Sequence, residues 1–268
     1  MNIHVRNLSF NYGGENLFYR LNVDLDGGEG SRPLVILGTS GCGKTTLLKL
    51  LGGLLKPREG SVFFSNEKSG RTAEERETFE KPLASFVFQE PRMLPWMTVL
   101  RNISLPLERE MGREAAAAKA RLYLSLVSFE GREGSYPAEL SGGQAQRVSI
   151  ARAFAFPAPV LFMDEPFQSL DIPLRLNLMD LILSIGEKDN STVPLPEKGR
   201  FLIIVTHDPR EAIYMAGRII ILGKSGEGII FDRTVNLSPE ERLFGSAAAG
   251  ELERELIVHL ANNRTIEE

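Results

Sequence analysis

Eight consecutive residues near the N-terminus have the types and spacing needed to hold phosphates. They run Gly38-Thr39-Ser40-Gly41-Cys42-Gly43-Lys44-Thr45 and fit the pattern G-x-x-x-x-G-K-[ST]. Glycines let such a loop curl, so that successive N–H groups point at phosphate oxygens, and the following helix adds its positive end. We predict that Lys44 neutralises the β- and γ-phosphates of a nucleotide, that the Thr45 hydroxyl ligates Mg²⁺, and that Thr46 joins the nucleotide contacts. An ordinary glycine-rich turn is the alternative, which the apolar run before the motif disfavours.

Two adjacent acids follow a second apolar run. Val160–Met163 predicts a strand that delivers Asp164 and Glu165 to the carboxyl edge of a sheet, where ligands gather in open α/β folds. We predict that Asp164 holds Mg²⁺ through water and that Glu165 is the general base that polarises an attacking water. A strand that merely runs into a turn is the alternative. Two acids near phosphates are useful only with a cation between them, so the phosphate loop favours the catalytic interpretation.

A third segment, Leu140-Ser141-Gly142-Gly143-Gln144, lies between these two motifs. It offers a hydroxyl and unhindered backbone N–H groups at the start of a helix expected over Gln144–Phe154, which makes an anion site without a lysine of its own. For this segment taken alone, Ser141 as an ordinary N-cap is the alternative. With the anion site, one chain would hold two half-sites for phosphate. Head-to-tail pairing of two copies in a closed C2 arrangement would complete both half-sites.

The composition bounds the class of protein. The 268 residues are 43% hydrophobic and 25% charged, ordinary values for a globular chain with a substantial core. The net charge of −4 argues against a nucleic-acid surface, which needs a clustered basic excess. Because Cys42 is the one cysteine, no intramolecular disulfide is possible, and we expect Cys42 to be a small filler rather than a reactive thiol. No apolar run is long enough for a signal peptide or a bilayer span, so any spanning part must belong to another chain.

The elements that must position these motifs predict an α/β fold. A loosely alternating segment from Ile3 to Leu25, with a turn near Gly13-Gly14, indicates antiparallel strands at the N-terminus. Short apolar runs alternating with helices indicate a mostly parallel sheet covered on both faces, as in the RecA-like core of P-loop nucleotide hydrolases. The strands expected in this sheet are Leu34–Leu37, Phe86–Phe88, Val160–Met163, Phe201–Val205 and Ile219–Leu222.

Helices complete the expected main domain, which covers residues 1–230. One helix begins at Gly43 or Lys44 and buries leucines between Leu47 and Leu51 before Gly52-Gly53 ends it. The helix-rich stretch at about residues 90–140 predicts an inserted helical subdomain.

A tail of residues 231–268 is expected to follow. We predict a helix that starts near Ser238-Pro239-Glu240 and packs on the main body through one apolar stripe. The stripe consists of Leu252, Leu256, Ile257 and Leu260. We expect a turn at residues 27–30, a surface excursion at 65–81 and a long surface loop at 186–199.

The order of these motifs resembles the ATP-binding subunit of an ABC transporter, over about residues 3–222. The run LSGGQAQR, from Leu140 to Arg147, is similar to the signature of that family. The phosphate loop, Gln89, the signature, the acid pair and His207 also follow one another in the family's order. Several independent motifs in register make the resemblance specific.

The resemblance implies roles for matching residues. Tyr12 matches the aromatic side chain that stacks on adenine, although Phe10 and Tyr19 lie nearby and the sequence does not prove which ring does so. Gln89 matches the glutamine that contacts Mg²⁺ and the attacking water, and His207 the histidine that contacts the γ-phosphate. Asp171, in Ser169-Leu170-Asp171, matches a loop that crosses the dimer interface. The groups expected to contact ATP held by the other subunit are Ser141, Gly142, Gly143 and Gln144.

These roles define three expected sets of site residues. The catalytic set is Lys44, Gln89, Glu165 and His207. The metal set is Thr45, Gln89 and Asp164. The cofactor-binding set comprises Tyr12, Gly38 to Thr46, Ser141 to Gln144 and Asp171.

One run of residues indicates a particular group within this family. Residues from Gln89 to Trp96, with Asn102 after them, are similar to importer ATPases of the nitrate, sulfonate and taurine group, and so is the stretch from Glu211 to Arg218. Gln168 stands where that group usually has a small residue, and the loop at 186–199 is longer than usual. We expect neither departure to touch the ATP chemistry.

The resemblance implies an ATPase that uses ATP and Mg²⁺, pairs with a second copy of itself and powers a separate permease at the cytoplasmic face of the membrane. A periplasmic or extracellular solute-binding protein would be an indirect partner, and nucleic acid would not be one. The apolar cluster of Met93, Leu94, Trp96 and Met97 is either a groove for a short permease helix or core of the helical subdomain. An exporter subunit, a soluble ABC-type ATPase acting on DNA or ribosomes, and a P-loop kinase or GTPase are the alternatives.

Overall fold

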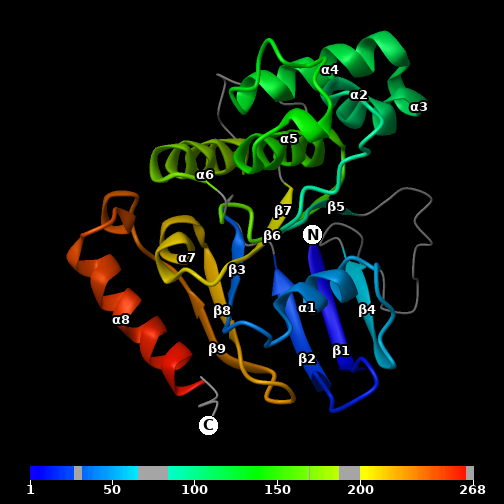
Figure 1. Ribbon diagram of the computed structural model, residues 1–268. Helices are drawn as coiled ribbons and strands as arrows, with labels where there is room; N and C mark the ends of the chain where they lie inside the picture. Colours follow the sequence, from blue (N-terminus) through cyan, green and yellow to red (C-terminus); the bar gives the residue numbers. More distant parts are fainter. Residues whose placement is uncertain (27–31, 66–83, 169, 187–199, 264–268) are drawn as a thin grey trace.

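The computed structural model describes residues 1–26, 32–65, 84–168, 170–186 and 200–263 (Figure 1). The turn expected at 27–30, nearly all of the excursion expected at 65–81 and the loop expected at 186–199, apart from Gly186, lie outside these ranges. The described strands form a three-stranded sheet of order β2-β1-β4 and a six-stranded sheet of order β5-β6-β7-β3-β8-β9. The predicted α/β fold, with a mostly parallel sheet and an N-terminal antiparallel sheet, is confirmed.

The six-stranded sheet is buried on both faces. Neighbouring strands from β5 to β8 pair in parallel, and β9 pairs with β8 in the antiparallel sense. Along β3, Val35 and Leu37 enter one hydrophobic core while Leu34 and Ile36 enter the other, which explains why this strand is wholly apolar. The strands are β3 (Leu34–Leu37), β5 (Ala84–Val87), β6 (Val160–Asp164), β7 (Phe201–Val205), β8 (Arg218–Leu222) and β9 (Ile229–Thr234).

Two strands are not predicted by the sequence. These are β4 (Glu59–Ser65) in the small sheet and β9 in the large one. Both are edge strands in which no residue is fully buried, and their apolar runs, Val62–Phe64 and Ile229–Phe231, are too short to indicate a strand by themselves. Because β9 crosses residue 230, the expected boundary between main domain and tail falls inside a strand of the main sheet.

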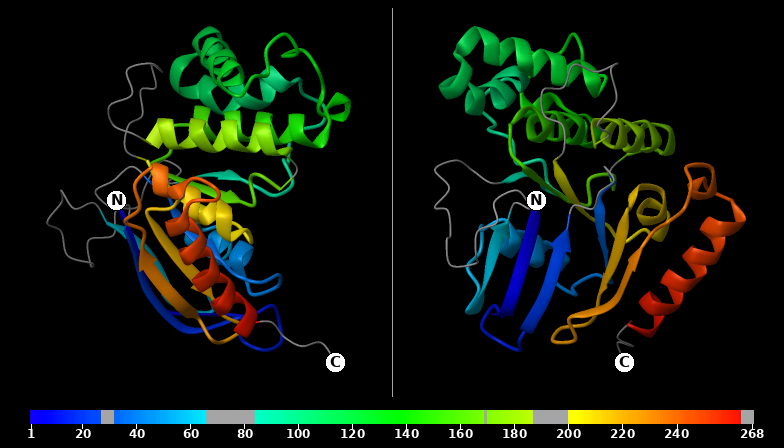
Figure 2. Two further views of the ribbon diagram at one scale, coloured as in Figure 1. Left: turned by 90° about the vertical axis from the view of Figure 1, so that its left-hand side faces the viewer. Right: turned by 180° about the vertical axis from the view of Figure 1, so that it is seen from behind.

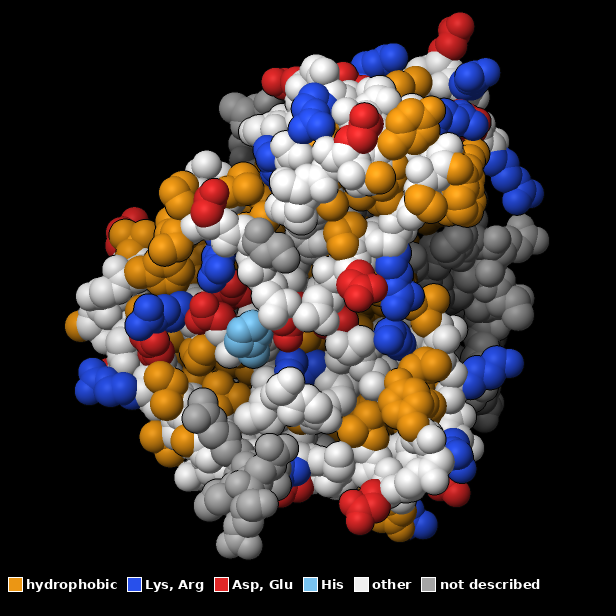
Figure 3. Space-filling view, in the orientation of Figure 1, with side chains coloured by type: hydrophobic (Ala, Val, Ile, Leu, Met, Phe, Trp, Pro, Cys, Tyr) orange, Lys and Arg blue, Asp and Glu red, His pale blue; other side chains and the backbone are white. Residues whose placement is uncertain are grey.

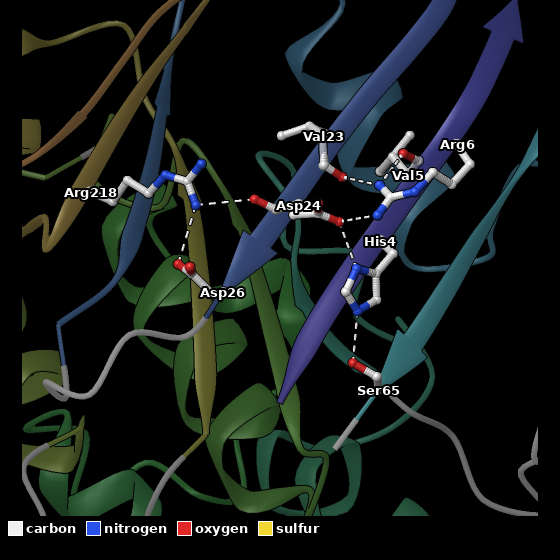
Figure 4. Close-up of polar contacts among 8 residues, drawn as sticks. All are labelled: His4, Val5, Arg6, Val23, Asp24, Asp26, Ser65 and Arg218. Atoms are coloured by element: carbon white, nitrogen blue, oxygen red, sulfur yellow. Dashed lines mark hydrogen bonds and ion pairs between the residues drawn. The ribbon is translucent and has the colours of Figure 1, made fainter. Parts of the chain in front are cut away.

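The small sheet joins β1 (Asn2–Phe10) to β2 (Phe18–Asp26) through a turn in which Gly13 has a φ of +109°. Polar side chains link its three strands (Figure 4). His4 Nδ1 lies 2.6 Å from Asp24 Oδ1, and His4 Nε2 lies 2.7 Å from Ser65 Oγ. Arg218 of β8 donates to the Asp24 carbonyl at 3.1 Å and to Asp26 Oδ1 at 3.2 Å, so the two sheets are also joined (Figure 4). His4 therefore has a structural role in this sheet.

The helices between β5 and β6 form a separate layer above the sheets (Figures 1 and 2). Ala116 and Ala120 are fully buried, and their small side chains let α4 lie close to its neighbours α2 and α5. No helix among the described residues is long and apolar enough to cross a membrane. The helices of this layer are α2 (Val99–Ser104), α3 (Glu108–Met111), α4 (Arg113–Leu126) and α5 (Gly142–Ala155).

The C-terminal helix α8 (Ala247–Asn262) begins later than the sequence predicts. Glu240–Arg242, within the expected start, forms a short 3-10 turn, and Ser246 caps α8 by accepting a hydrogen bond from the backbone N–H of Ala249 at 3.1 Å. α8 lies beside β9 in both Figures 1 and 2. The expected apolar stripe is wrong at Ile257, which is 47% exposed, whereas Leu252 and Leu256 are buried.

Candidate functional site

The loop between β3 and α1 (Lys44–Leu51) has a backbone that requires glycine at particular positions. Gly43 has a φ of +102°, and a Cβ there would lie 2.9 Å from the Phe18 ring. At Gly38 a Cβ would lie 2.5 Å from the Cys42 sulfur. Side chains at either position would push the loop open, so these glycines fix its curled shape.

The Lys44 side chain is hydrogen-bonded to the backbone of this loop. Its ammonium group donates to the carbonyl oxygens of Gly38 and Thr39, both at 2.9 Å, and the residue is only 7% exposed. Cys42 is buried, and burial raises the pKa of its thiol, although Lys44 opposes that shift. A raised pKa leaves little thiolate, which agrees with Cys42 as a filler.

Thr45 and Asp164 meet at the carboxyl ends of β3 and β6. The Thr45 hydroxyl donates to Asp164 Oδ2 at 2.7 Å. Asp164 Oδ1 is buried and has no hydrogen-bond partner among the described residues. Burial raises the pKa of the Asp164 carboxyl, and the nearby Glu165 adds to that shift while the Thr45 hydrogen bond opposes it.

An oxygen pair with one unpartnered buried oxygen fits Mg²⁺, a hard cation that prefers oxygen ligands. The described residues contain no cluster of three or more His, Cys, Asp or Glu side chains that could hold a metal alone. Phosphate oxygens and water would therefore complete the coordination of Mg²⁺, as is usual where this ion binds with a nucleotide.

Glu165 is held in a strained backbone conformation beside His207. Its φ is +46°, in the left-handed region that a glutamate rarely adopts, and its backbone N–H donates to the Val205 carbonyl at 2.9 Å. His207 Nδ1 lies 3.3 Å from Glu165 Oε2. Such strain persists only where the surroundings fix it, and it is concentrated at functional sites. The predicted base and the predicted γ-phosphate contact therefore lie side by side.

A buried carboxylate supports the turn that carries His207. Glu211 Oε2 accepts a hydrogen bond from the Thr206 hydroxyl at 2.5 Å, and Glu211 Oε1 lies 3.2 Å from Arg175. Burial raises the pKa of Glu211, with the Thr206 hydrogen bond opposing that shift. Asp208 caps the helix α7 (Pro209–Met215) that follows. In the sequence, Glu211 stood out only as the start of a stretch similar to importer ATPases. The structure shows that its carboxylate also supports the turn before His207.

Gln89 contacts Gln168, a residue that was not predicted to belong to the site. The Gln89 side-chain amide donates to Gln168 Oε1 at 2.8 Å, and both side chains line the same cavity. Gln168 therefore contacts a residue of the predicted catalytic and metal sets. A small residue at position 168 could not make this contact, and no motif signals it.

The predicted residues of the phosphate loop and its surroundings enclose one cavity of about 860 Å³. On the face drawn in Figure 3, acidic, basic and histidine side chains gather between the helical layer and the sheets. Gln168, Leu17 and Leu260 were not predicted as site residues. The described lining residues are Tyr12, Leu17, Gly38, Thr39, Ser40, Gly41, Gly43, Lys44, Thr45, Thr46, Gln89, Glu165, Gln168, His207 and Leu260.

Tyr12 is the aromatic residue that faces this cavity. It is 69% exposed, and its hydroxyl lies 3.1 Å from Thr46 Oγ1. Phe10 is buried and contacts the Tyr12 ring edge-on at 4.9 Å between centroids. Tyr19 is exposed and does not line the cavity. Of the three aromatic rings that the sequence left as candidates, Tyr12 is therefore the one that lines the cavity.

The segment Ser141–Gln144 is not among the described residues that line the cavity. Ser141 caps α5, where its hydroxyl accepts from the Gln144 N–H at 3.4 Å, and Gln144 Oε1 accepts from the Ser141 N–H at 3.0 Å. Asp171 Oδ1 accepts from the Leu174 N–H at 2.9 Å at the start of α6 (Ile172–Gly186). Ser169 lies outside the described residues. In a single chain these predicted contacts are therefore separate from the phosphate loop.

The apolar cluster after Gln89 is partly exposed. Trp96 is 69% exposed, so the core alternative does not hold for this residue, whereas Met93 packs against the main hydrophobic core. Asn102 shapes this loop: its side chain accepts from the Leu94 N–H at 2.7 Å and donates to the Met97 carbonyl at 3.0 Å.

Comparison with known proteins identifies the family of this site. Residues 21–168 match the family described as ABC transporter. The aliphatic sulfonates import ATP-binding protein SsuB of Escherichia coli (strain K12) is 37% identical over 224 residues, covering 84% of this chain and 78% of that protein. The sulfate/thiosulfate import ATP-binding protein CysA 2 of Rhizobium meliloti (strain 1021) is 37% identical over 229 residues, and the match covers 84% of this chain but 58% of CysA 2.

Solved structures extend the similarity to the fold. A dimeric structure of a post-hydrolysis state of the ATP-binding cassette MJ0796 bound to ADP and Pi has a TM-score of 0.72 and 30% identity, covering 88% of this chain and 100% of that chain. A dimeric structure of MJ0796 described as a bacterial ABC transporter cassette has a TM-score of 0.71 and 31% identity. The predicted resemblance and fold are confirmed, and the chain belongs to the ABC transporter family.

Proposed function

We propose that this chain is the ATP-binding and ATP-hydrolysing subunit of an ABC importer for sulfonate-like solutes. The observation that carries the proposal is the meeting of Thr45, Asp164, Glu165 and His207 at the mouth of the phosphate loop. The names of the relatives, which are import ATP-binding proteins, support import over the exporter alternative.

In this proposal the nucleotide lies along the cavity. Tyr12 stacks on adenine, and the backbone N–H groups from Gly38 to Thr46 bind the phosphates with Lys44. Lys44 exchanges its two carbonyl contacts for phosphate oxygens, a stronger charge-assisted interaction. Thr45, Asp164 and Gln89 would hold Mg²⁺, which neutralises charge on the phosphates.

Hydrolysis follows from the position of Glu165. Its carboxylate takes a proton from a water whose oxygen attacks the γ-phosphorus, while the bond to the bridging β–γ oxygen breaks and ADP leaves with that electron pair. His207, 3.3 Å from Glu165, orients the carboxylate and contacts the γ-phosphate. Lys44 stabilises the charge that spreads over the transferred group.

A second copy of the chain completes each site. The segment Ser141–Gln144, at the N-terminus of α5, would contact the γ-phosphate held by the partner, and Asp171 would lie at the shared interface. The dimeric solved structures of a relative support this arrangement. The chain up to the end of β9 at Thr234, with the helical insertion at about 90–140, would form the cassette, and the residues after Thr234 its tail.

Transport requires further chains. We propose that the exposed Trp96, on the loop shaped by Asn102, contacts a permease subunit, which holds this chain at the cytoplasmic face of the membrane. A solute-binding protein would deliver the solute to that permease. The net charge of −4 disfavours a nucleic-acid partner.

The variant Glu165→Gln tests the proposal. It should bind ATP normally, hydrolyse it at least about 100-fold more slowly because the general base is lost, and remain trapped as an ATP-loaded dimer. Light scattering with size exclusion measures the dimer, and phosphate release measures hydrolysis. Glu251→Gln, on the exposed face of α8, is the matched control and should behave like the parent chain. A Glu165→Gln chain that stays monomeric with ATP and hydrolyses it at the parent rate would defeat the assignment.

A further inference from the structure

We propose that the last turn of α8 is a wall of the nucleotide site and that Leu260 contacts the adenosine part of the nucleotide. The inference rests on the proposed ATP binding. Leu260 lines the same cavity as the phosphate loop, although it lies in the C-terminal helix far along the chain.

An amide side chain fixes this turn to the end of β8. Asn263, one helical turn beyond Leu260, is only 4% exposed. Its Nδ2 donates to the Leu222 carbonyl at 3.0 Å, and its Oδ1 accepts from the Lys224 N–H at 3.1 Å. Because residues three apart share one face of a helix, the pair of bonds at Asn263 sets where Leu260 points.

The carbonyl that Asn263 holds also lies against the phosphate loop. A Cβ placed on Gly38 would be 3.2 Å from the Leu222 oxygen. The hairpin after β8 also contacts another lining residue, since the Gly226 N–H donates to the Leu17 carbonyl at 3.1 Å. The tail helix, the hairpin and the loop that carries Leu17 are therefore connected around the cavity.

The rest of α8 is held firmly against the main body. Leu252 and Leu256 are buried in the main hydrophobic core. The His259 ring contacts Phe231 of β9 with 4.9 Å between centroids, and Arg210 pairs with Glu253 at 2.7 Å. The position of Leu260 is thus set by packing along the whole helix.

The chemistry of the lining identifies what Leu260 touches. Among the described lining residues, three have large non-polar side chains: Tyr12, Leu17 and Leu260. The others are glycines or polar residues grouped about the phosphate loop and the acid pair. Contact with a charged phosphate does not stabilise an aliphatic side chain, whereas contact with the apolar surface of a base or ribose does. Leu260 therefore serves the adenosine end of the site.

Calorimetric titration with ATP and with inorganic tripolyphosphate tests the inference. Leu260→Ala should weaken ATP binding about fivefold to tenfold, because a hydrophobic contact of this size is lost, while tripolyphosphate binding stays unchanged. Val258→Ala, on the same helix but 57% exposed, is the control and should alter neither affinity. An unchanged ATP affinity for Leu260→Ala, or an equal loss for both ligands, would overturn the inference.

Two further variants guard against a purely structural effect. Leu260→Asn nearly keeps the length and shape of the side chain but makes it polar, and it should show the same selective loss of ATP affinity. Asn263→Ala removes the anchor and should produce a smaller loss with the same selectivity, which identifies Asn263 as a positioning residue. Equal weakening of both ligands in both variants would count against the proposed wall. A parent chain that binds neither ATP nor tripolyphosphate would instead contradict the proposed function itself.

Discussion

The two anion-binding segments of this chain differ in how complete they are. In the phosphate loop, Lys44 is buried and lies against the loop carbonyls, and Thr45 already meets Asp164. The segment Ser141–Gln144 is exposed, and its hydroxyl and amide groups are occupied by each other in a helix cap. The first segment contains its own lysine, whereas the cation at the second is Arg132, which donates to Gln144 Oε1 at 3.1 Å. In the proposed function, one chain therefore binds a nucleotide through the first segment and uses the second segment on a nucleotide held by its partner.

Lys44→Ala should have the largest effect, because it removes the cation of the enclosed site. We expect ATP affinity to fall at least about 100-fold, which corresponds to losing a charge-assisted contact worth about 3 kcal/mol. Calorimetric titration measures the affinity. Lys56→Ala, an exposed lysine beyond α1, should bind like the parent chain. Normal ATP binding by Lys44→Ala would remove the basis for the distinction between the two segments.

Ser141→Ala tests the second anion-binding segment. A single chain should bind ATP as before, while ATP-dependent dimerisation and turnover fall about tenfold or more, because a donor to the partner's phosphate is lost. The change also removes a helix cap, at a cost of about 1 kcal/mol of unfolding free energy. Ser246→Ala is the matched control because it removes the corresponding cap of α8 without touching the segment. Equal turnover in the two variants would show that Ser141 is no more than a cap.

Asp164→Asn should give the smallest effect, on the stability of the nucleotide-free protein. The pKa of Asp164 is raised in the folded chain, chiefly by burial, so ionisation of this carboxyl destabilises the fold as pH rises through that pKa. At neutral pH the variant should gain about 1 kcal/mol, since it also removes the charge from an unpartnered buried oxygen. The gain should shrink as pH falls towards the ordinary aspartate pKa.

Urea unfolding of both chains at pH 7.5 and pH 4.5 measures this difference. Glu211, whose pKa is also raised by burial, is present in both chains and cancels in the comparison. A variant that is less stable at neutral pH would show that the charge of Asp164 is satisfied without a cation. Stabilisation by ATP with Mg²⁺ should be weaker in the variant, because Asp164 is a proposed metal contact.

The predictable parts of the fold are those where local sequence and tertiary environment agree. β6 and β7 are buried on both faces, which leaves wholly apolar runs that any reader of the sequence can find. The edge strands β4 and β9 carry mixed residues and give no such signal. The start of α8 is similar: Ser238-Pro239 resembles a helix start, yet the helix begins after the next capping residue, Ser246.

The same division applies to the site. The sequence by itself determined the phosphate loop, the acid pair and the segment at Ser141, because each is a short run of particular residue types next to an apolar strand or at the start of a helix. Only the tertiary structure decided that Tyr12 rather than Phe10 faces the cavity, that Gln168 contacts Gln89, and that Leu260 lines the same cavity. Those contacts depend on packing between distant segments, and no local spacing of residues encodes which side chains such packing brings together.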